Sequence, residues 1–189
     1  FNQSKMKKFD IVILAAGFSS RMGESKMEIV LKGKTVLEHT ISQAYDLSEN
    51  IFVVTGRFHN SMERLLSHYK KVNLVYNANY EAGMFSSVKI GIQKVKFENF
   101  FLIPGDIPFV KKETYRKLSE RTGKIIIPSY SGRKGHPVLM SSELIPKILN
   151  EDNNSNLRNF IRRQKTTIIE VKDKFILKDL NYPKDLKGL

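Results

Sequence analysis

The feature that most constrains the fold is an unbroken apolar run at residues 11–14, Ile-Val-Ile-Leu, which ends in Ala15-Ala16-Gly17. Short, fully apolar runs are typical of a central strand in a parallel sheet, which is buried on both faces. A polar loop with Ser19, Arg21 and Lys26 follows. Small residues leave backbone N–H groups open to phosphate oxygens, and cations neutralise their charge. The sequence therefore predicts polyphosphate binding at the carboxyl end of a strand.

Short apolar runs alternate with helical patterns along the chain, which is typical of stacked βαβ units. The expected strands are 11–14, 51–55, 72–76, 100–103, 125–127, 138–140, 166–171 and 175–177. The expected helices are 36–45, 61–69, 86–95, 113–121, 144–149 and 157–163, with a last helical turn from Pro183. We therefore predict an α/β fold of the doubly wound, Rossmann-like kind, with three layers, a mainly parallel sheet and ligands at the carboxyl ends of the strands.

Length and composition indicate one domain without a membrane span. A chain of 189 residues is long enough for one sizeable core and short for two, so 1–189 are expected to form a single domain. Residues 1–8 are expected to be a flexible start, and those ahead of Met6 to derive from a vector. No apolar run approaches the ~20 residues of a membrane span, and none fits a signal peptide. The chain contains no cysteine, so we expect no disulfide and a cytoplasmic location.

The net charge of +13 is compatible with a nucleic acid, a membrane surface or polyanionic small molecules as partners. The lysines are scattered over the whole chain, however, and no aromatic residues are interleaved with the few adjacent pairs of cations. A solvated, lysine-rich surface is the favoured interpretation. We therefore expect neither a nucleic-acid partner nor a membrane partner.

Asp106 follows the expected strand 100–103 and is bracketed by Pro104 and Pro108. The prolines restrict the backbone and position the carboxylate in advance. A carboxylate at the same sheet edge as a phosphate-binding loop indicates a bridging Mg²⁺, which prefers oxygen ligands and shares them with substrate phosphates. A simple turn is the alternative role for this aspartate.

Two further segments contain candidate ligand-binding residues. Gly83 lets the chain turn before a helix, and Ser86 or Ser87 either caps that helix or also faces a ligand at its N-terminus. In the tight loop 132–137, His136 either binds a phosphate of a second substrate or holds the loop by hydrogen bonds. His39, His59 and His68 lie in or beside helical patterns and are expected to be structural.

These segments resemble, in order, the motifs of nucleotidyltransferases, and most closely those of molybdenum cofactor cytidylyltransferases. Residues 14–26 are similar to the signature LAAG-x-S-x-RMG-x-x-K, and 105–108 to GD-[IM]-P. Residues 83–87 are similar to GM-x-S-S and 135–137 to GHP. Residues 179–186 resemble the late segment D-[IV]-N-T-P-x-D-L, with Tyr182 in place of the usual threonine.

The resemblance implies roles for individual residues. As nucleotide-binding residues it implies Leu14, Ala15, Ala16, Gly17, Ser19, Arg21, Lys26, Asn79, Gly83, Ser86 and Ser87. As catalytic residues it implies Arg21, Lys26 and Asp106, and as metal ligands Asp106 and Asp179. As acceptor-binding residues it implies Arg133, Gly135 and His136.

The activity that the resemblance implies is Mg²⁺-dependent transfer of CMP from CTP to molybdenum-bearing molybdopterin, with release of pyrophosphate. The product would be the cytosine dinucleotide cofactor of a molybdenum hydroxylase. CTP is favoured because the loop reads Leu-Ala-Ala-Gly, whereas the guanylyl branch usually has Leu-Ala-Gly-Gly. The alternatives are another nucleoside triphosphate, a sugar or polyol phosphate acceptor, and a non-catalytic protein that hands on the cofactor.

Overall fold

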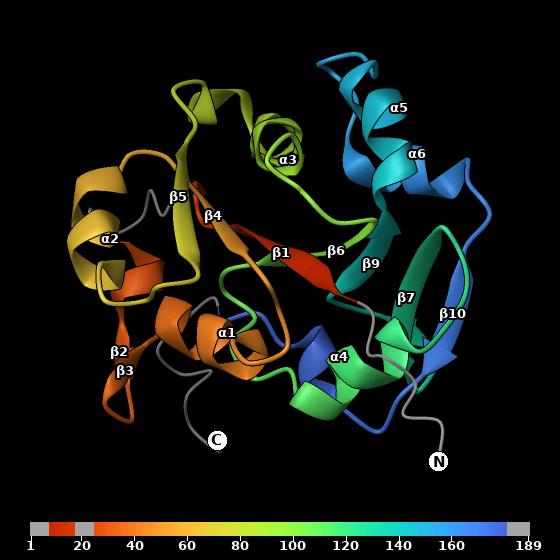
Figure 1. Cartoon of the computed structure of the whole chain (residues 1–189), viewed down its shortest axis with the longest axis horizontal. Helices are drawn as coiled ribbons and strands as arrows, with labels where there is room; N and C mark the ends of the chain where they lie inside the picture. Colours follow the sequence, from red (N-terminus) through yellow and green to blue (C-terminus); the bar gives the residue numbers. More distant parts are fainter. Residues whose placement is uncertain (1–7, 18–24, 181–189) are drawn as a thin grey trace.

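A central β-sheet with helices on both faces organises the protein (Figure 1). The computed structural model describes residues 8–17 and 25–180. In this part of the chain an eight-stranded sheet has the order β10-β7-β9-β6-β1-β4-β5, with β8 beside β7. The strands are β1 (Phe9–Leu14), β4 (Ile51–Thr55), β5 (Val72–Tyr76), β6 (Asn99–Pro104), β7 (Ile125–Tyr130), β8 (Arg133–Lys134), β9 (Val138–Ser141) and β10 (Thr167–Glu170).

β1 is the central strand that its apolar sequence predicts. Every residue of the strand is buried, and it pairs in parallel with β4 on one side and β6 on the other. Ile11 and Ile13 belong to one core cluster, and Val12 and Leu14 to another on the opposite face of the sheet. This division follows from the alternation of side chains along a strand.

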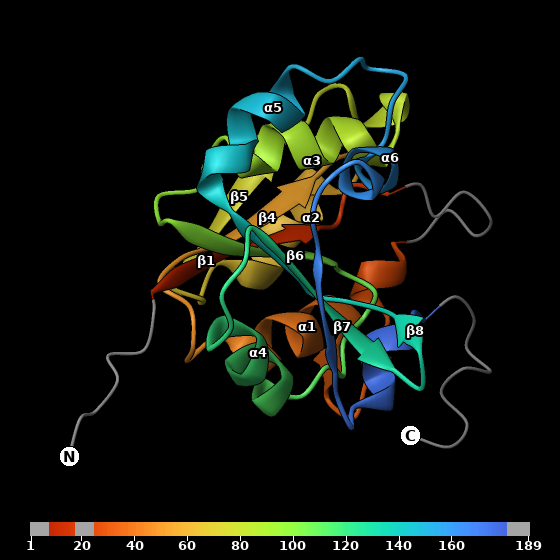
Figure 2. The same cartoon turned by 90° about the vertical axis from the view of Figure 1, so that its right-hand side faces the viewer.

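The helices cover the sheet in two layers (Figure 2). On one face α1 (Val36–Ala44), α2 (His59–Leu66) and α4 (Lys112–Ser119) contribute buried side chains to the cluster that contains Ile11. On the other face lie α3 (Met84–Ile92), α5 (Ile145–Leu149) and α6 (Leu157–Arg162). The predicted three-layer α/β fold with a mainly parallel sheet is confirmed, since β1, β4, β5 and β6 form one parallel block and β10 is parallel to β7.

Strand β9 departs from the parallel arrangement and lies antiparallel between β6 and β7. Its register pairs Val138 with Leu102. The residues that enter β9 therefore arrive at the same edge of the sheet as the residues that leave β6. The loop that precedes β9, residues 135–137 (the leading loop of β9), therefore lies at the same edge of the sheet as the loops that follow the parallel strands.

The prediction of a strand at 175–177 is wrong, because this segment forms the 3₁₀ helix η4 (Lys174–Leu177). Asp173 precedes it, and its Oδ1 accepts a hydrogen bond from Phe175 N at 3.1 Å. Its Oδ2 accepts from Lys111 N and from Thr114 Oγ1, both at 2.8 Å. This buried cap fixes a helical turn, in which Ile176 is the residue buried in the core.

A short hairpin of β2 (Val30–Leu31) and β3 (Lys34–Thr35) was not expected from the sequence. Lys32 and Gly33 connect the strands with φ of 48° and 84°, as a tight hairpin turn requires. The hairpin leads into α1, where Thr35 and Glu38 form a capping box.

The helical turn expected from Pro183 lies outside the described residues. No helix within 8–17 and 25–180 has the length and apolarity needed to cross a membrane.

Candidate functional site

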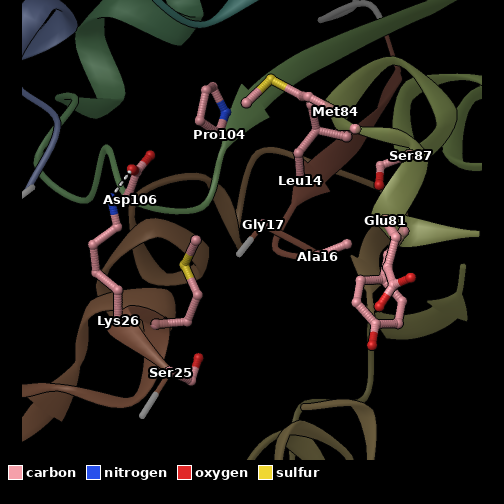
Figure 3. Close-up of a pocket in the computed structure, with 13 residues that line it drawn as sticks. Leu14, Ala16, Gly17, Ser25, Lys26, Glu81, Met84, Ser87, Pro104 and Asp106 are labelled. Carbon is pink, nitrogen blue, oxygen red and sulfur yellow. Dashed lines mark hydrogen bonds and ion pairs between the residues drawn. The ribbon is translucent and has the colours of Figure 1, made fainter. Parts of the chain in front are cut away.

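A pocket of about 360 Å³ lies at the carboxyl edge of the parallel strands (Figure 3). It is formed where the chain leaves β1 and β6, by the 3₁₀ helix η1 (Lys26–Glu28), and by the segment from η2 (Tyr80–Ala82) into α3. The residues that line it are Leu14, Ala16, Gly17, Ser25, Lys26, Met27, Tyr80, Glu81, Gly83, Met84, Ser87, Pro104 and Asp106. The pocket therefore contains many of the residues that the sequence singled out.

The turn that carries Asp106 is held from several directions. Gly105 N donates to Leu14 O at 2.9 Å, and Leu180 N donates to Asp106 O at 2.9 Å. Thr40 in α1, which the sequence analysis missed, donates its hydroxyl to Gly105 O at 2.7 Å. A Cβ at Gly105 would lie 2.9 Å from Met27 Sδ and 3.2 Å from Leu14 O, so this turn is closely packed against the end of β1. The carboxylate is therefore positioned by the backbone before any ligand arrives.

Lys26 and Asp106 meet across the pocket. Lys26 Nζ lies 2.6 Å from Asp106 Oδ2, and the side chains are 25% and 18% exposed. A charge-assisted hydrogen bond with this degree of shielding is stronger than an exposed ion pair. The structure thus brings together the expected phosphate-binding cation and the expected metal ligand. Arg21 and Ser19 lie outside the described residues.

His136 and Asp179 lie beside the same turn. Burial lowers the pKa of His136, whereas the negative charges of Asp106 and Asp179 raise it, and the net direction is downward. Nδ1 of His136 is buried without a hydrogen-bond partner in the described part of the protein. The leading loop of β9 is fixed here because His136 N donates to Ile176 O at 2.9 Å. A Cβ at Gly135 would overlap that same carbonyl, so the approach of the loop to η4 requires glycine.

The residues predicted to bind the acceptor, Arg133, Gly135 and His136, lie at different distances from the Asp106 turn. His136 is close enough to Asp106 for its pKa to respond to that charge. Arg133, in contrast, lies in β8, is exposed and is absent from the pocket lining. Neither Gly135 nor His136 lines the pocket either, but His136 lies near the Asp106 turn, whereas Arg133 lies on the exposed surface of β8.

The start of α3 forms the wall opposite Lys26 and Asp106 (Figure 3). Gly83 has a φ of 97°, which glycine adopts readily, and it and Ser87 line the pocket. Ser86 instead donates its hydroxyl to Gly83 O at 2.7 Å, and neither Ser86 nor Asn79 lines the pocket. Of the nucleotide-binding residues predicted in this segment, Gly83 and Ser87 are in direct reach of a ligand. Ala15, predicted after β1, is buried and also does not line the pocket.

The sequence analysis missed several lining residues, among them Tyr80, Glu81 and Met84. Tyr80 packs against Gly56, where a Cβ would lie 2.7 Å from Tyr80 Cγ and 3.1 Å from Ala16 O. Met84 is 63% exposed, although it is a large apolar residue. This wall therefore offers apolar surface to a ligand. The position of these residues directly before and within the Gly83 turn was an available signal.

Asp106 and Asp179 offer carboxylate oxygens of the kind that Mg²⁺ prefers. No group of three or more His, Cys, Asp or Glu side chains that could hold a metal occurs in residues 8–17 and 25–180. A cation that takes one or two protein carboxylates and completes its shell with water and substrate phosphates fits this donor set. A cation that needs a full cage of protein ligands does not.

Comparisons with known proteins agree with this geometry. A family model described as "MobA-like NTP transferase domain" matches residues 11–168. The chain is 30% identical to the molybdenum cofactor cytidylyltransferase of Escherichia coli over 95% of this chain and 94% of that protein. It is 26% identical to a probable molybdenum cofactor guanylyltransferase of Bacillus cereus, over 79% and 78% of the two chains.

A solved structure has the same fold. A nucleotidyl transferase from Methanothermobacter thermautotrophicus superposes with a TM-score of 0.80 at 22% identity, over 94% of this chain and 93% of that one. At this identity the likeness concerns the fold. It agrees with the arrangement of sheet and helices described above.

Proposed function

Because this chain belongs to the MobA-like NTP transferases and is therefore a nucleotidyltransferase enzyme, we propose that it transfers CMP from CTP to a phosphate of molybdenum-bearing molybdopterin and releases pyrophosphate. The observation that carries the proposal is the meeting of Lys26 and Asp106 in the pocket at the carboxyl edge of the sheet. The 30% identical relative from Escherichia coli is named for this activity. The leading loop of β9 matches the motif of the same subgroup.

The opposite characters of the pocket walls support an orientation for the nucleotide. Lys26 and Asp106 form an ion pair on one side, whereas Met84 and Ser87 provide apolar and hydroxyl surface beside the Glu81 carboxylate on the other (Figure 3). The triphosphate would lie toward Lys26 and the base toward α3. Nothing lies within 4 Å of a Cβ built at Gly17, so the backbone between the two ends is open to close approach.

Lys26 would bind the β- and γ-phosphates and stabilise the charge that gathers on the departing pyrophosphate. Transfer of a nucleotidyl group asks for in-line placement and charge neutralisation more than for covalent help from the protein. The attacking group is itself a phosphate that is anionic near neutral pH. The pocket therefore needs no general base for this reaction.

Nucleotidyltransferases of this family generally use a divalent metal, and we propose Mg²⁺ held by Asp106 and Asp179. When bound, Mg²⁺ would neutralise phosphate charge. Asp106 forms an ion pair with Lys26. Arrival of the nucleotide gives Lys26 phosphate oxygens as new partners, and this exchange releases the carboxylate.

The acceptor phosphate would approach from the side of His136, in the leading loop of β9. Arg133, on the adjacent surface, would attract the acceptor from further away. The product dinucleotide would then pass to a molybdenum hydroxylase in the cytoplasm. A second candidate activity uses GTP, since the 26% identical relative from Bacillus cereus is named a probable guanylyltransferase.

The test combines the purified full chain with Mg²⁺, one acceptor (molybdenum-bearing molybdopterin, a sugar phosphate or a polyol phosphate) and, separately, CTP, GTP, ATP and UTP. Release of pyrophosphate is measured for each. Turnover with CTP is the expected result. Turnover with GTP alone would replace the first activity by the second, and reaction only with a sugar or polyol phosphate would overturn the choice of acceptor. The absence of turnover in every combination would overturn the proposal.

A further inference from the structure

Asn77 is a buried amide behind the α3 wall of the pocket, and none of the sequence motifs includes it. It follows β5, where its backbone N–H donates to Thr55 O at 2.9 Å. The residue is 3% exposed, so its side-chain amide has to find its hydrogen bonds within the protein. Its neighbours therefore determine what Asn77 does.

A backbone donor fixes the orientation of the Asn77 amide. Asn79 N lies 3.0 Å from Oδ1 of Asn77. A backbone N–H can only donate, so the side-chain atom that faces it is the oxygen. Nδ2 therefore faces α3, where it donates to Ser86 Oγ at 2.9 Å and to Ser87 Oγ at 3.0 Å. Both hydroxyls consequently act as acceptors toward Asn77.

The hydroxyl groups of Ser86 and Ser87 differ in the hydrogen bonds that they donate. Ser86 donates to Gly83 O at 2.7 Å, which satisfies it locally. Ser87 lines the pocket near Leu14 and Ala16 (Figure 3), and within the described residues its hydroxyl accepts from Asn77 and donates no hydrogen bond. A hydroxyl has a single proton to donate. Since one lone pair of the Ser87 oxygen accepts from Asn77, the hydroxyl has its proton and one further lone pair to offer to whatever occupies the pocket.

We propose that Asn77 is a positioning residue that makes Ser87 a hydrogen-bond donor to the nucleotide base and so selects cytosine over uracil. This inference rests on the proposed function, in which the base lies against α3. Cytosine presents an unprotonated ring nitrogen, N3, whereas uracil carries a proton there. The Ser87 proton is satisfied by the first base. The N3–H of the second base can be met only by the lone pair that Asn77 leaves free, and the Ser87 proton is then turned away from the base.

The substitution Asn77→Asp tests the inference because it reverses the hydrogen bonds. The carboxylate still accepts from Asn79 N, but it has no donor for Ser86 and Ser87. Both hydroxyls would then donate to residue 77, and Ser87 would present lone pairs to the pocket. The readout is the Kd of the full chain for UTP divided by that for CTP, measured by calorimetry with Mg²⁺. We expect this ratio to fall by roughly tenfold or more.

Matched variants separate this role from a structural one. Asn73→Asp makes the same change on the exposed side of β5 and should leave the ratio unaltered. In a Ser87→Ala background, Asn77→Asp should have no further effect on the ratio, because its effect passes through the missing hydroxyl. An equal loss of affinity for CTP and UTP in Asn77→Asp would show a structural residue only and overturn the inference.

The measurement also distinguishes failure of the inference from failure of the proposed function. A wild-type chain that binds CTP, with an unaltered ratio in Asn77→Asp, overturns the inference alone. A wild-type chain that binds no nucleoside triphosphate overturns both. If Asn77→Asp does not fold, Ser87→Ala by itself should weaken CTP binding more than UTP binding, and equal weakening would again overturn the inference.

Discussion

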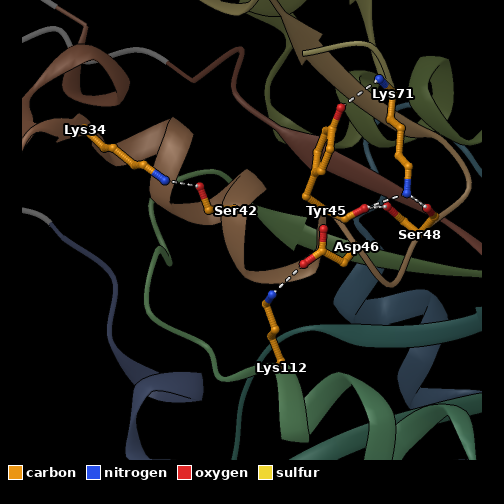
Figure 4. Close-up of polar contacts among 7 residues, drawn as sticks. All are labelled: Lys34, Ser42, Tyr45, Asp46, Ser48, Lys71 and Lys112. Atoms are coloured by element: carbon orange, nitrogen blue, oxygen red, sulfur yellow. Dashed lines mark hydrogen bonds and ion pairs between the residues drawn. The ribbon is translucent and has the colours of Figure 1, made fainter.

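Lysines in two regions of this protein make ionic contacts of similar length in very different surroundings. Lys26 Nζ lies 2.6 Å from a carboxylate that a buried turn holds in place at the edge of a pocket. On the α1 side of the molecule, Lys112 Nζ lies 2.7 Å from Asp46, whose side chain is 72% exposed (Figure 4). Distance alone therefore does not distinguish a shielded contact in the pocket from an exposed contact on the surface.

Lys71 represents an intermediate case. Its Nζ donates to Tyr45 O and Ser48 O, both at 2.9 Å, where α1 ends (Figure 4). A cation at the C-terminus of a helix satisfies carbonyls that have no partner within the helix. The comparison shows that the net charge of +13 combines at least three uses of lysine: a pocket contact, a helix cap and a solvated pair. Substitutions at these sites should have effects that decrease in this order.

The largest effect is expected for Asp106→Asn, which keeps the shape of the side chain and removes its charge. If Asp106 holds the metal, kcat should fall by roughly a thousandfold, because charge neutralisation by a metal is worth several kcal/mol in the transition state. Pyrophosphate release is the measurement. Asp46→Asn makes the same change in the surface pair and should leave turnover intact. A comparable loss in both variants would contradict the distinction between the regions.

Lys26→Met should reduce kcat by roughly a hundredfold through the loss of a donor to the phosphates. It should also make the protein without nucleotide bind Mn²⁺ more tightly, because Lys26 Nζ no longer occupies Asp106. Electron paramagnetic resonance of added Mn²⁺ measures this binding. Unaltered Mn²⁺ affinity would show that the ion pair does not compete with the cation.

Lys71→Met should lower the free energy of unfolding by about 1 kcal/mol, because carbonyls at the end of α1 lose a charged donor. Turnover should stay at the wild-type level. Urea unfolding followed by circular dichroism measures the first effect and pyrophosphate release the second. A loss of turnover without a loss of stability would mean that this region contributes to the reaction.

The smallest effect is expected for Lys112→Met. The hydrogen bond and charge of Lys112 hold the pKa of Asp46 below its usual value. In the variant this pKa should rise, which NMR titration of the Asp46 carboxyl would detect. A carboxyl whose pKa is lowered by folding stabilises the protein above its unfolded pKa and loses that contribution as pH falls through the folded value. The variant should therefore be slightly less sensitive to acid than the wild type, and equally active.

The parallel half of the sheet could be predicted from the sequence because β1 and its neighbours are buried on both faces and read as continuous apolar runs. The half of the sheet that contains β9 was harder to predict from the sequence. The antiparallel direction of β9 is set by pairing with β6 and β7, which leaves no mark on the periodicity of 138–140. The helical turn at 175–177 depends on bonds that Asp173 makes to distant parts of the chain.

The candidate site divides in the same way. Lys26 and Asp106 stand in local motifs, and the structure brings them into contact. Thr40 and Asn77 escaped notice because each acts through tertiary hydrogen bonds, Thr40 on the Asp106 turn and Asn77 on the serines that begin α3. A threonine within a helical pattern and an asparagine after a strand are ordinary in sequence. Their partners become visible only when the chain is folded.

The reversed direction of β9 has a practical consequence for protein engineers. Segments on either side of the pocket come from opposite directions of the chain, since 14–17 and 104–106 leave strands whereas 135–137 enter one. Exposed side chains of the entering segment, such as Arg133 and Lys134, can therefore be changed in charge without altering the exits of β1 and β6, provided that Gly135 is kept against η4. Libraries randomised at 133, 134 and 136, with Gly135 kept, would thus test new acceptors for the proposed reaction while Lys26 and Asp106 stay unaltered.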